Sequence, residues 1–297
     1  MHMFLRSAGF SQYKKQVDIE NLLDVIQEHY QDSARVLENE YGEQCVEIRG
    51  EVAENIGIVI AGVRDENGKF HRQYYYPYVQ AEDVTTMYPV MVDRHVDDRS
   101  LKASVEDVHI GVSLIFSLDN TMDYMELRAA GKVNPDRPID KAVSRLAAFS
   151  TEGKVLLPSI QTADVPVANL INGRPRASLL SAAKNGDQQA IEELAMNDMN
   201  LMQEMDERLK REDMYSIVDQ CVMPQGIECD IYMVLGKILN VYIKKNIITG
   251  EEIYDLTVLA DEITFHVAIN ALDLEGEPEP GRRFKGMIWM MGKVDFC

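Results

Sequence analysis

The spacing of apolar residues predicts both helices and strands in the first half of the chain. From Asp18 to Tyr30, apolar residues recur at three- and four-residue steps, which is the helical period. We therefore expect a surface helix here with one buried stripe, capped by Asp18. Residues 108–118 alternate at every second position instead, which predicts a strand with one face in the core. A second helix is expected to follow this strand and to stop at Gly131.

Two hairpins are also expected in this half. An Asn-Gly pair at 67–68 separates an apolar strand at 57–63 from a strand at 69–76, and Asn-Gly supplies the positive φ angles of a tight turn. A Glu-Gly pair at 152–153 predicts the turn of the other hairpin. Alternation places three aromatic residues of the strand after the first turn on one face: Phe70, Tyr74 and Tyr76.

The pattern divides the chain into four parts and predicts an α+β fold. Residues 1–160 indicate a mostly antiparallel sheet with helices on it. Residues 161–175 contain two prolines and little periodicity, which is typical of a linker. Residues 176–223 predict a string of short helices, one of them capped by Asp187. Residues 224–297 hold about five short strands, which indicate a small β-barrel domain, with an OB-like arrangement as one option.

Composition and charge exclude several classes of protein. The chain has 30 basic and 49 acidic residues, for a formal net charge of −19. A duplex nucleic-acid binder and a protein of anionic membrane surfaces are therefore not expected. No apolar run approaches the roughly 18 residues of a membrane helix, and the N-terminus lacks the pattern of a signal peptide. Four scattered cysteines in a chain of this length indicate a cytoplasmic protein with reduced thiols.

Recognisable catalytic and cofactor motifs are missing from the sequence. It contains no HExxH, no GxSxG elbow, no GxGxxG and no GxxxxGK[ST] loop. The densest ligand-type cluster surrounds His95, but it has no second His or Cys at metal-ligand spacing. We therefore expect no metal and no cofactor, and we favour a protein that is not an enzyme.

Our leading hypothesis is a module that binds another macromolecule, either a protein partner or a second copy of the chain. The last strand is apolar on both faces over its second half, so it is either covered on both sides or part of an interface. Methionines spaced three apart in the helical part can also line a groove for a partner. The candidate binding surface consists of Met202, Arg282, Arg283, Lys285, Met287 and Trp289.

Two alternatives of other classes stay open. The first is a small-molecule or metal-binding sensor, or an enzyme of unfamiliar type, whose pocket would contain His71, His95 and His109. The second is binding of single-stranded nucleic acid by the C-terminal barrel. In that case Arg282, Arg283 and Lys285 would contact phosphates and Trp289 would stack on a base.

Several strings of residues are distinctive although they carry no nameable chemistry. They are Phe4-Leu-Arg-Ser-Ala-Gly-Phe, Asp65-Glu-Asn-Gly-Lys-Phe-His with Tyr75-Tyr-Pro-Tyr, Val112-Ser-Leu-Ile-Phe with Leu118-Asp-Asn, and Gly276-Glu-Pro-Glu-Pro-Gly-Arg-Arg-Phe-Lys-Gly-Met-Ile-Trp. With them the chain resembles, over nearly its whole length, a bacterial family catalogued only as domain of unknown function 3881. The resemblance implies a bacterial cytosolic protein of this length, and it supplies no reaction, ligand or catalytic residue.

Overall fold

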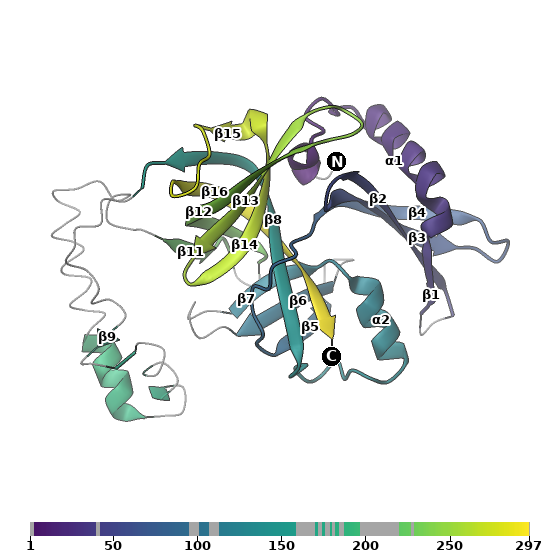
Figure 1. The fold of residues 1–297 in the computed structure, drawn as a ribbon. Coiled ribbons are helices and arrows are strands. Elements are labelled where there is room, and N and C mark those ends of the chain that lie inside the picture. Colours follow the sequence, from purple (N-terminus) through teal and green to yellow (C-terminus); the bar gives the residue numbers. More distant parts are fainter. Residues whose placement is uncertain are drawn as a thin grey trace.

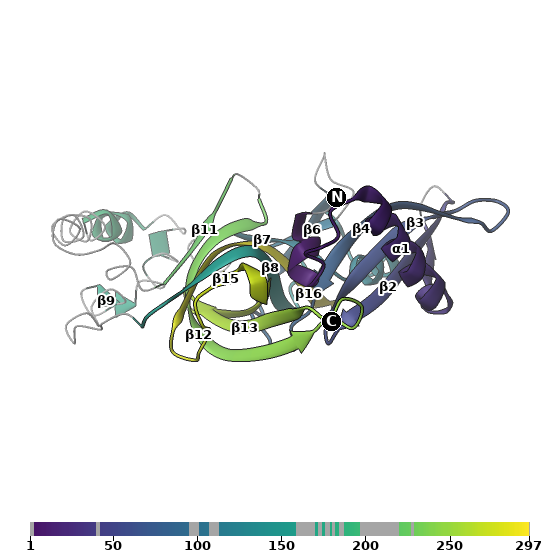
Figure 2. The same ribbon diagram turned by 90° about the horizontal axis from the view of Figure 1, so that it is seen from above.

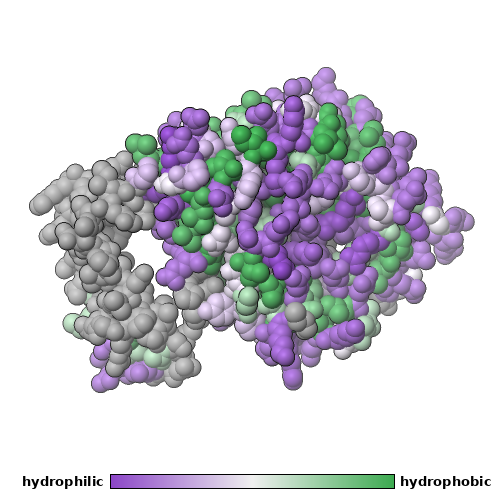
Figure 3. Space-filling model, in the orientation of Figure 1, coloured by the Kyte–Doolittle hydropathy of each residue, from purple (hydrophilic) through white to green (hydrophobic). Residues whose placement is uncertain are grey.

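The computed structural model describes most of the chain and shows an α+β fold made mostly of strands (Figure 1). The described residues are 3–39, 42–94, 101–106, 113–158, 170–171, 174–175, 179, 182–183, 187–196, 220–226 and 229–296. None of the helices in these ranges is long and apolar enough to cross a bilayer. In the view of Figure 3, hydrophilic side chains cover most of the coloured surface, and smaller apolar patches lie between them.

The N-terminal part forms a four-stranded antiparallel sheet in chain order. Its strands are β1 (Arg35–Glu38), β2 (Gln44–Ala53), β3 (Ile56–Arg64) and β4 (Phe70–Val79). Helix α1 (Gln16–Tyr30) covers one face of this sheet and helix α2 (Thr121–Ala129) lies at the other (Figure 1). Two short 3-10 helices, η1 (Met3–Ala8) and η2 (Gln31–Ser33), flank α1 along the chain.

Helix α1 confirms the predicted apolar stripe but not its predicted cap. The buried residues are the predicted ones, Ile19, Leu22, Leu23 and Ile26. The N-cap lies three residues earlier than expected, at Lys15, which makes no side-chain hydrogen bond. Asp18 therefore lies inside the first turn, where its negative charge still suits the helix dipole.

A second sheet of ten strands contains all the long strands of the C-terminal part. Its hydrogen-bonded order is β11-β12-β13-β14-β8-β16-β7-β6-β5, with β15 beside β8. The bounds are β5 (Val90–Arg94), β6 (Leu101–Glu106), β7 (Ser113–Leu118), β8 (Ala142–Leu156), β11 (Cys221–Pro224), β12 (Ile231–Lys245), β13 (Glu252–Ala260), β14 (Ile263–Asn270), β15 (Leu274–Glu275) and β16 (Arg283–Phe296). The 3-10 helix η3 (Ala271–Asp273) follows β14, and β9 (Leu170–Ile171) and β10 (Arg174–Pro175) form a separate pair.

Five strands of this sheet pair in a closed cycle, because β12 pairs with β16 as well as with β13. From β13 the cycle continues to β14, then to β8 in parallel register, and returns to β16. We call these five strands the ring. Figures 1 and 2 show the ring beside the four-stranded sheet, with η1 between the two.

The ring combines strands from the N-terminal and C-terminal parts of the chain, and it corrects one predicted hairpin. Strand β8 comes from the N-terminal part and pairs with C-terminal strands on both of its edges, so the ten-stranded sheet joins the predicted units 1–160 and 224–297. The hairpin predicted at residues 152–153 does not form, because β8 runs through it without a turn. Gly153 is required by packing instead, since a Cβ there would lie 2.6 Å from the Phe284 ring.

Strand β16 is buried on both faces, as its sequence indicated. Phe284, Ile288 and Met290 belong to a core that fills the ring and extends under β5–β7. Trp289 and Met291 belong to a second core, formed with η1, α1 and the four-stranded sheet. The Trp289 ring stacks on Phe4 of η1 at 5.2 Å between centroids. Of the two options left open, double coverage is therefore the one observed for this half of the strand.

The expected hairpin at 67–68 is confirmed, but a β-bulge changes the predicted face of its second strand. The register between β3 and β4 shifts by one residue, so that Arg72 pairs with Gly62 and Tyr74 pairs with Ala61. Gln73 is the extra residue, and an extra residue reverses the side of every side chain beyond it. Phe70 packs toward α1, whereas Tyr74 and Tyr76 lie on the opposite face.

The described part of the middle segment is helical over residues 188–196. The carboxylate of Asp187 accepts hydrogen bonds from the backbone N–H groups of Gln189 and Ala190, which confirms the predicted cap. Ala190 and Leu194 pack against Leu179 in a small core.

Asp230 fills the point where one edge of β16 changes its partner. This edge pairs with β12 up to Trp289 and with β7 from Met291 onward. Between them, the Met290 N–H donates to the backbone carbonyl of Asp230 at 2.8 Å. The buried Asp230 carboxylate accepts hydrogen bonds from Trp289 Nε1 at 2.8 Å and Ser117 Oγ at 2.7 Å. Lys102 Nζ completes the cluster at 3.2 Å.

We predict that Asp230→Asn lowers the free energy of unfolding by roughly 1–3 kcal/mol, because the neutral amide weakens the hydrogen bonds from Trp289 and Ser117 and removes the negative charge that faces Lys102. Trp289 is the only tryptophan of the chain, so its fluorescence during urea unfolding measures this loss directly. Glu54→Gln, at an exposed turn of the other sheet, is the control. Equal stability of the two variants would contradict the role assigned to Asp230.

Candidate functional site

The face of the four-stranded sheet that points toward α2 is unusually polar. On β2, Val46 and Ile48 are buried in the core beneath α1, so the residues that alternate with them, Cys45, Glu47 and Arg49, point the other way. After the bulge, β4 places Tyr74, Tyr76 and Tyr78 on this same face. The result is a surface of carboxylate, guanidinium, thiol and phenol groups facing a helix.

A cavity of about 730 Å³ lies between this face and α2. Its described lining combines apolar side chains with polar ones. The apolar lining includes Leu37, Ala61, Val63, Leu101, Met122 and Met125, and the polar lining includes Glu38, Glu43, Cys45, Glu47, Tyr74 and Arg128.

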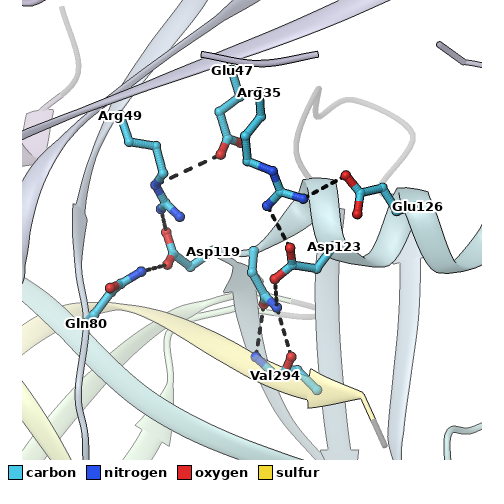
Figure 4. A network of polar contacts seen from close by, with 9 residues as sticks. Arg35, Glu47, Arg49, Gln80, Asp119, Asp123, Glu126 and Val294 are labelled. Carbon is cyan, nitrogen blue, oxygen red and sulfur yellow. Dashed lines mark hydrogen bonds and ion pairs between the residues drawn. The ribbon is translucent and has the colours of Figure 1, made fainter. Parts of the chain in front are cut away.

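An ion-pair network lies behind the cavity and reaches its lining through Glu47 (Figure 4). Arg49 lies between two carboxylates, pairing closely with Asp119 and with Glu47 at 3.9 Å from Nε to Oε1. Gln80 Nε2 donates to the second oxygen of Asp119 at 2.6 Å. The Arg49 guanidinium also lies over the Tyr78 ring, 4.4 Å from its centroid, a distance suited to a cation–π contact.

A second set of contacts holds α2 against the sheet. Arg35 of β1 reaches both Asp123 at 2.6 Å and Glu126 at 2.9 Å on the helix. Asn120 precedes the helix and exchanges two hydrogen bonds with the backbone of Val294 on β16, at 2.8 and 3.0 Å. The helix is thus tied at its beginning to β16 and along its side to β1, which fixes the width of the cavity.

Glu47 is the most perturbed carboxyl group of the site. The residue is only 5% exposed. Burial raises its pKa to about 7, since the attraction of Arg49 does not offset the loss of hydration and the charge of Asp119 opposes ionisation. Burial also raises the pKa of Tyr78 to about 12 and that of Tyr76 well above its ordinary value. Near neutral pH, Glu47 can therefore either donate or accept a proton, while the tyrosines stay neutral.

The structure does not assemble the candidate binding surface as predicted. Arg283 and Trp289 are buried, and their polar groups bond inward, Arg283 Nε to the Leu157 carbonyl at 3.0 Å and Trp289 Nε1 to Asp230. Trp289 also packs in the second core, so the side chains of these two residues make their contacts within the chain. Arg282, Lys285 and Met287 are half-buried, and Met202 lies outside the described residues.

Of the three histidines of the predicted pocket, His71 is the one that lies within the described residues. His71 is exposed and bonds to Asp65 of its own hairpin at 2.8 Å. His95 and His109 lie outside the described residues. Within the described ranges, no group of three or more His, Cys, Asp or Glu side chains could hold a metal ion.

The polar residues of the cleft were not selected from the sequence. Alternation in residues 45–49 does show one apolar face and one polar face, but such a polar face is typical of a strand whose outer side is exposed to solvent. Glu47 and Arg49 are unusual because the segment that contains Asp119 and α2 covers them. Asp119, the partner of Arg49, lies 70 residues later in the sequence. No local pattern reports that contact.

Comparison with known proteins identifies a family but no activity. Over residues 5–292 the chain matches the model of the family described as "Domain of unknown function, E. rectale Gene description (DUF3881)". No curated protein and no solved structure matches it.

We predict that Glu47 makes the protein less stable as pH rises. Its pKa is raised from 4.5 to about 7 on folding, so the folded state holds this proton more tightly than the unfolded state. The penalty is absent below pH 4.5, grows up to pH 7 and then stays constant at about 3 kcal/mol. Glu47→Gln should therefore be more stable than the wild type at pH 8 and similar to it at pH 4.5.

Urea unfolding at several pH values between 4.5 and 8, followed by Trp289 fluorescence, measures this difference. Other titrating groups are common to both proteins and cancel. Glu54→Gln serves as the exposed control and should follow the wild type throughout. Parallel curves for the wild type and Glu47→Gln would show that Glu47 ionises normally in the folded state.

Proposed function

The chain belongs to the DUF3881 family, whose description assigns no activity, and we propose from the geometry that it binds a small organic molecule in the cleft between the β1–β4 sheet and α2. One observation carries this proposal. A cavity of about 730 Å³ is lined by apolar side chains and by a buried carboxyl group that titrates near neutrality.

The size and lining of the cleft support a ligand of drug-like dimensions. Small-molecule sites usually enclose roughly 300–1,000 Å³ and combine an apolar lining with a few placed polar groups. Leu37, Met122 and Met125 supply the apolar lining, and Glu47 supplies a polar group at the inner end. The ion pairs of Arg35 and Arg49 hold the two walls in place before a ligand arrives, which reduces the entropic cost of binding.

We propose binding without a reaction. Cys45 lines the cleft, but burial and Glu43 raise the pKa of its thiol, whereas a nucleophilic cysteine needs a lowered pKa. The three described cysteines are free, which supports a reducing compartment such as the cytoplasm.

We propose that the ring supports this site. We interpret the ring as a small closed β-barrel in which β8 is the fifth strand. Side chains such as Tyr232, Phe265 and Phe284 fill its interior, as is usual for barrels of this size. A ligand is therefore better accommodated beside the ring than inside it.

Self-association is a second candidate function, and one observation favours it. Three methionines form a row across neighbouring strands, with Met223 opposite Met233 and Met233 opposite Met287. Val222 and Val234, their neighbours, point into the core, so the row faces outward, and Met223 is 52% exposed. Methionine rows adapt readily to a partner surface.

We predict that a screen of amphiphilic metabolites by thermal shift identifies at least one ligand of the wild type. At a concentration of 100 Kd, binding adds about 2.7 kcal/mol to the free energy of unfolding. Ala61→Phe should abolish the shift, because Ala61 lines the cavity and a phenyl ring there occupies its floor.

Val36→Phe is the matched control, because it adds the same ring to a neighbouring exposed position of the sheet. It should bind like the wild type. A ligand whose shift persists in Ala61→Phe binds elsewhere, and that result, or the absence of any shift across the screen, would overturn the cleft as a binding site.

For self-association, we predict that sedimentation equilibrium of the wild type gives a mass above the 33.7 kDa of one chain. Met233→Lys should restore the monomer mass, because it places a charge in the middle of the methionine row. Glu54→Lys adds a charge elsewhere and should leave the mass unchanged. A wild type that is monomeric at all concentrations would exclude this function.

A further inference from the structure

The cleft also indicates which class of molecule it takes, an inference that rests on the binding function proposed above. Glu47, Ala61 and Tyr74 are register partners on three adjacent strands, and all three line the cavity. Strands lie about 4.8 Å apart, so Glu47 and Tyr74 stand about 10 Å from each other across Ala61. Because Ala61 has only a methyl group, the space between the carboxyl group and the phenol ring stays open.

That separation suits a positive group. An ammonium group pairs with a carboxylate at about 2.8 Å, and it interacts favourably with an aromatic face within about 6 Å of the ring centroid. A single cation above Ala61 can therefore contact both side chains. The stacking of Tyr74 on Tyr76, at 6.3 Å between centroids, holds the ring in this position.

The balance of charge in the site points to the same class. Arg49 pairs with Asp119 and lies over the Tyr78 ring. Its positive charge therefore balances the charge of ionised Glu47 only in part. Glu38 and Glu43 add negative charge to the lining, and Arg128 is the basic residue among its described members. An anionic ligand would add to this excess, whereas a cation would neutralise it.

We propose that the ligand is an organic cation, with an ammonium group between Glu47 and Tyr74 and an apolar body against Met122 and Met125 of α2. The carboxyl group supplies charge recognition, the ring supplies a cation–π contact, and the methionines accommodate the apolar part.

Binding of such a cation releases a proton, because the ammonium stabilises the ionised form of Glu47. The proton passes from the Glu47 carboxyl group to the buffer. The other charged and titratable groups that act on Glu47 are Arg49 on β2, Arg35 on β1, Tyr76 on β4, and Asp119 and Asp123 beside and on α2. Burial and the two aspartates oppose ionisation, whereas Arg49 and Arg35 favour it, and the resulting pKa of about 7 leaves the unliganded carboxyl close to half-protonated at pH 7.

Three probes that share one apolar body test the class of ligand: octylammonium, octan-1-ol and octanoate. Isothermal titration calorimetry at pH 7 measures their affinities for the wild type and for three variants. We expect the cation to bind more tightly than the alcohol, and octanoate to bind least. Glu47→Gln should weaken cation binding at least tenfold and change alcohol binding less than twofold, while Tyr74→Leu should weaken cation binding about threefold. Glu54→Gln should behave like the wild type.

Titrations in phosphate and in Tris measure the released proton, because the two buffers differ in their heat of protonation. We expect about half a proton per bound cation for the wild type at pH 7 and none for Glu47→Gln. This readout separates a role in charge recognition from a role in packing alone.

The possible failures are distinguishable. If octan-1-ol or octanoate binds as well as the cation, the cleft is a binding site but the assigned class of ligand is wrong. If the cation binds equally to Glu47→Gln without proton release, the assignment to Glu47 is wrong. If none of the three probes binds, the class and the cleft are both overturned.

Discussion

The structure depends on a constraint at strand β16, which pairs with other strands along both edges and is buried on both faces over much of its length. Along one edge it pairs with β8 over nearly its whole length, and along the other it pairs first with β12 and then with β7. The strand pairing has a gap where the antiparallel partner β12 ends and the parallel partner β7 begins. The buried backbone groups in this gap must still be hydrogen-bonded. Asp230 meets this requirement with its carbonyl for Met290 and its carboxylate for Trp289, Ser117 and Lys102.

This arrangement explains why the four-stranded sheet can carry a site on one face. The end of β16 receives Asn120 and thereby fixes the beginning of α2. The helix then stands opposite β2 and β4, and the polar groups on those strands are removed from water. Glu47 illustrates the consequence, since a carboxyl group that would be fully ionised on an open sheet has a pKa of about 7 under the helix.

Local patterns predicted the elements well and their surroundings poorly. The stripe of α1 and the cap at Asp187 were predictable because both depend on residues within one or two turns of the chain. The face of Tyr74 was not, because the bulge at Gln73 is set by pairing with β3. The role of Gly153 was not predictable either. The Phe284 ring requires a glycine at this position, and that ring comes from a strand far away in the sequence.

By itself, the sequence determined the α+β class, the positions of many helices and strands, the family resemblance, and the acidic net charge. The class and the elements follow from periodicity within a short window, the charge follows from composition, and the resemblance follows from distinctive strings of residues. Only the tertiary structure decided that β8 joins the ring, that Trp289 packs in the second core, and that Glu47 lines a covered cleft. These depend on contacts between segments far apart along the chain, and no periodicity of a single segment records which other segment will cover it.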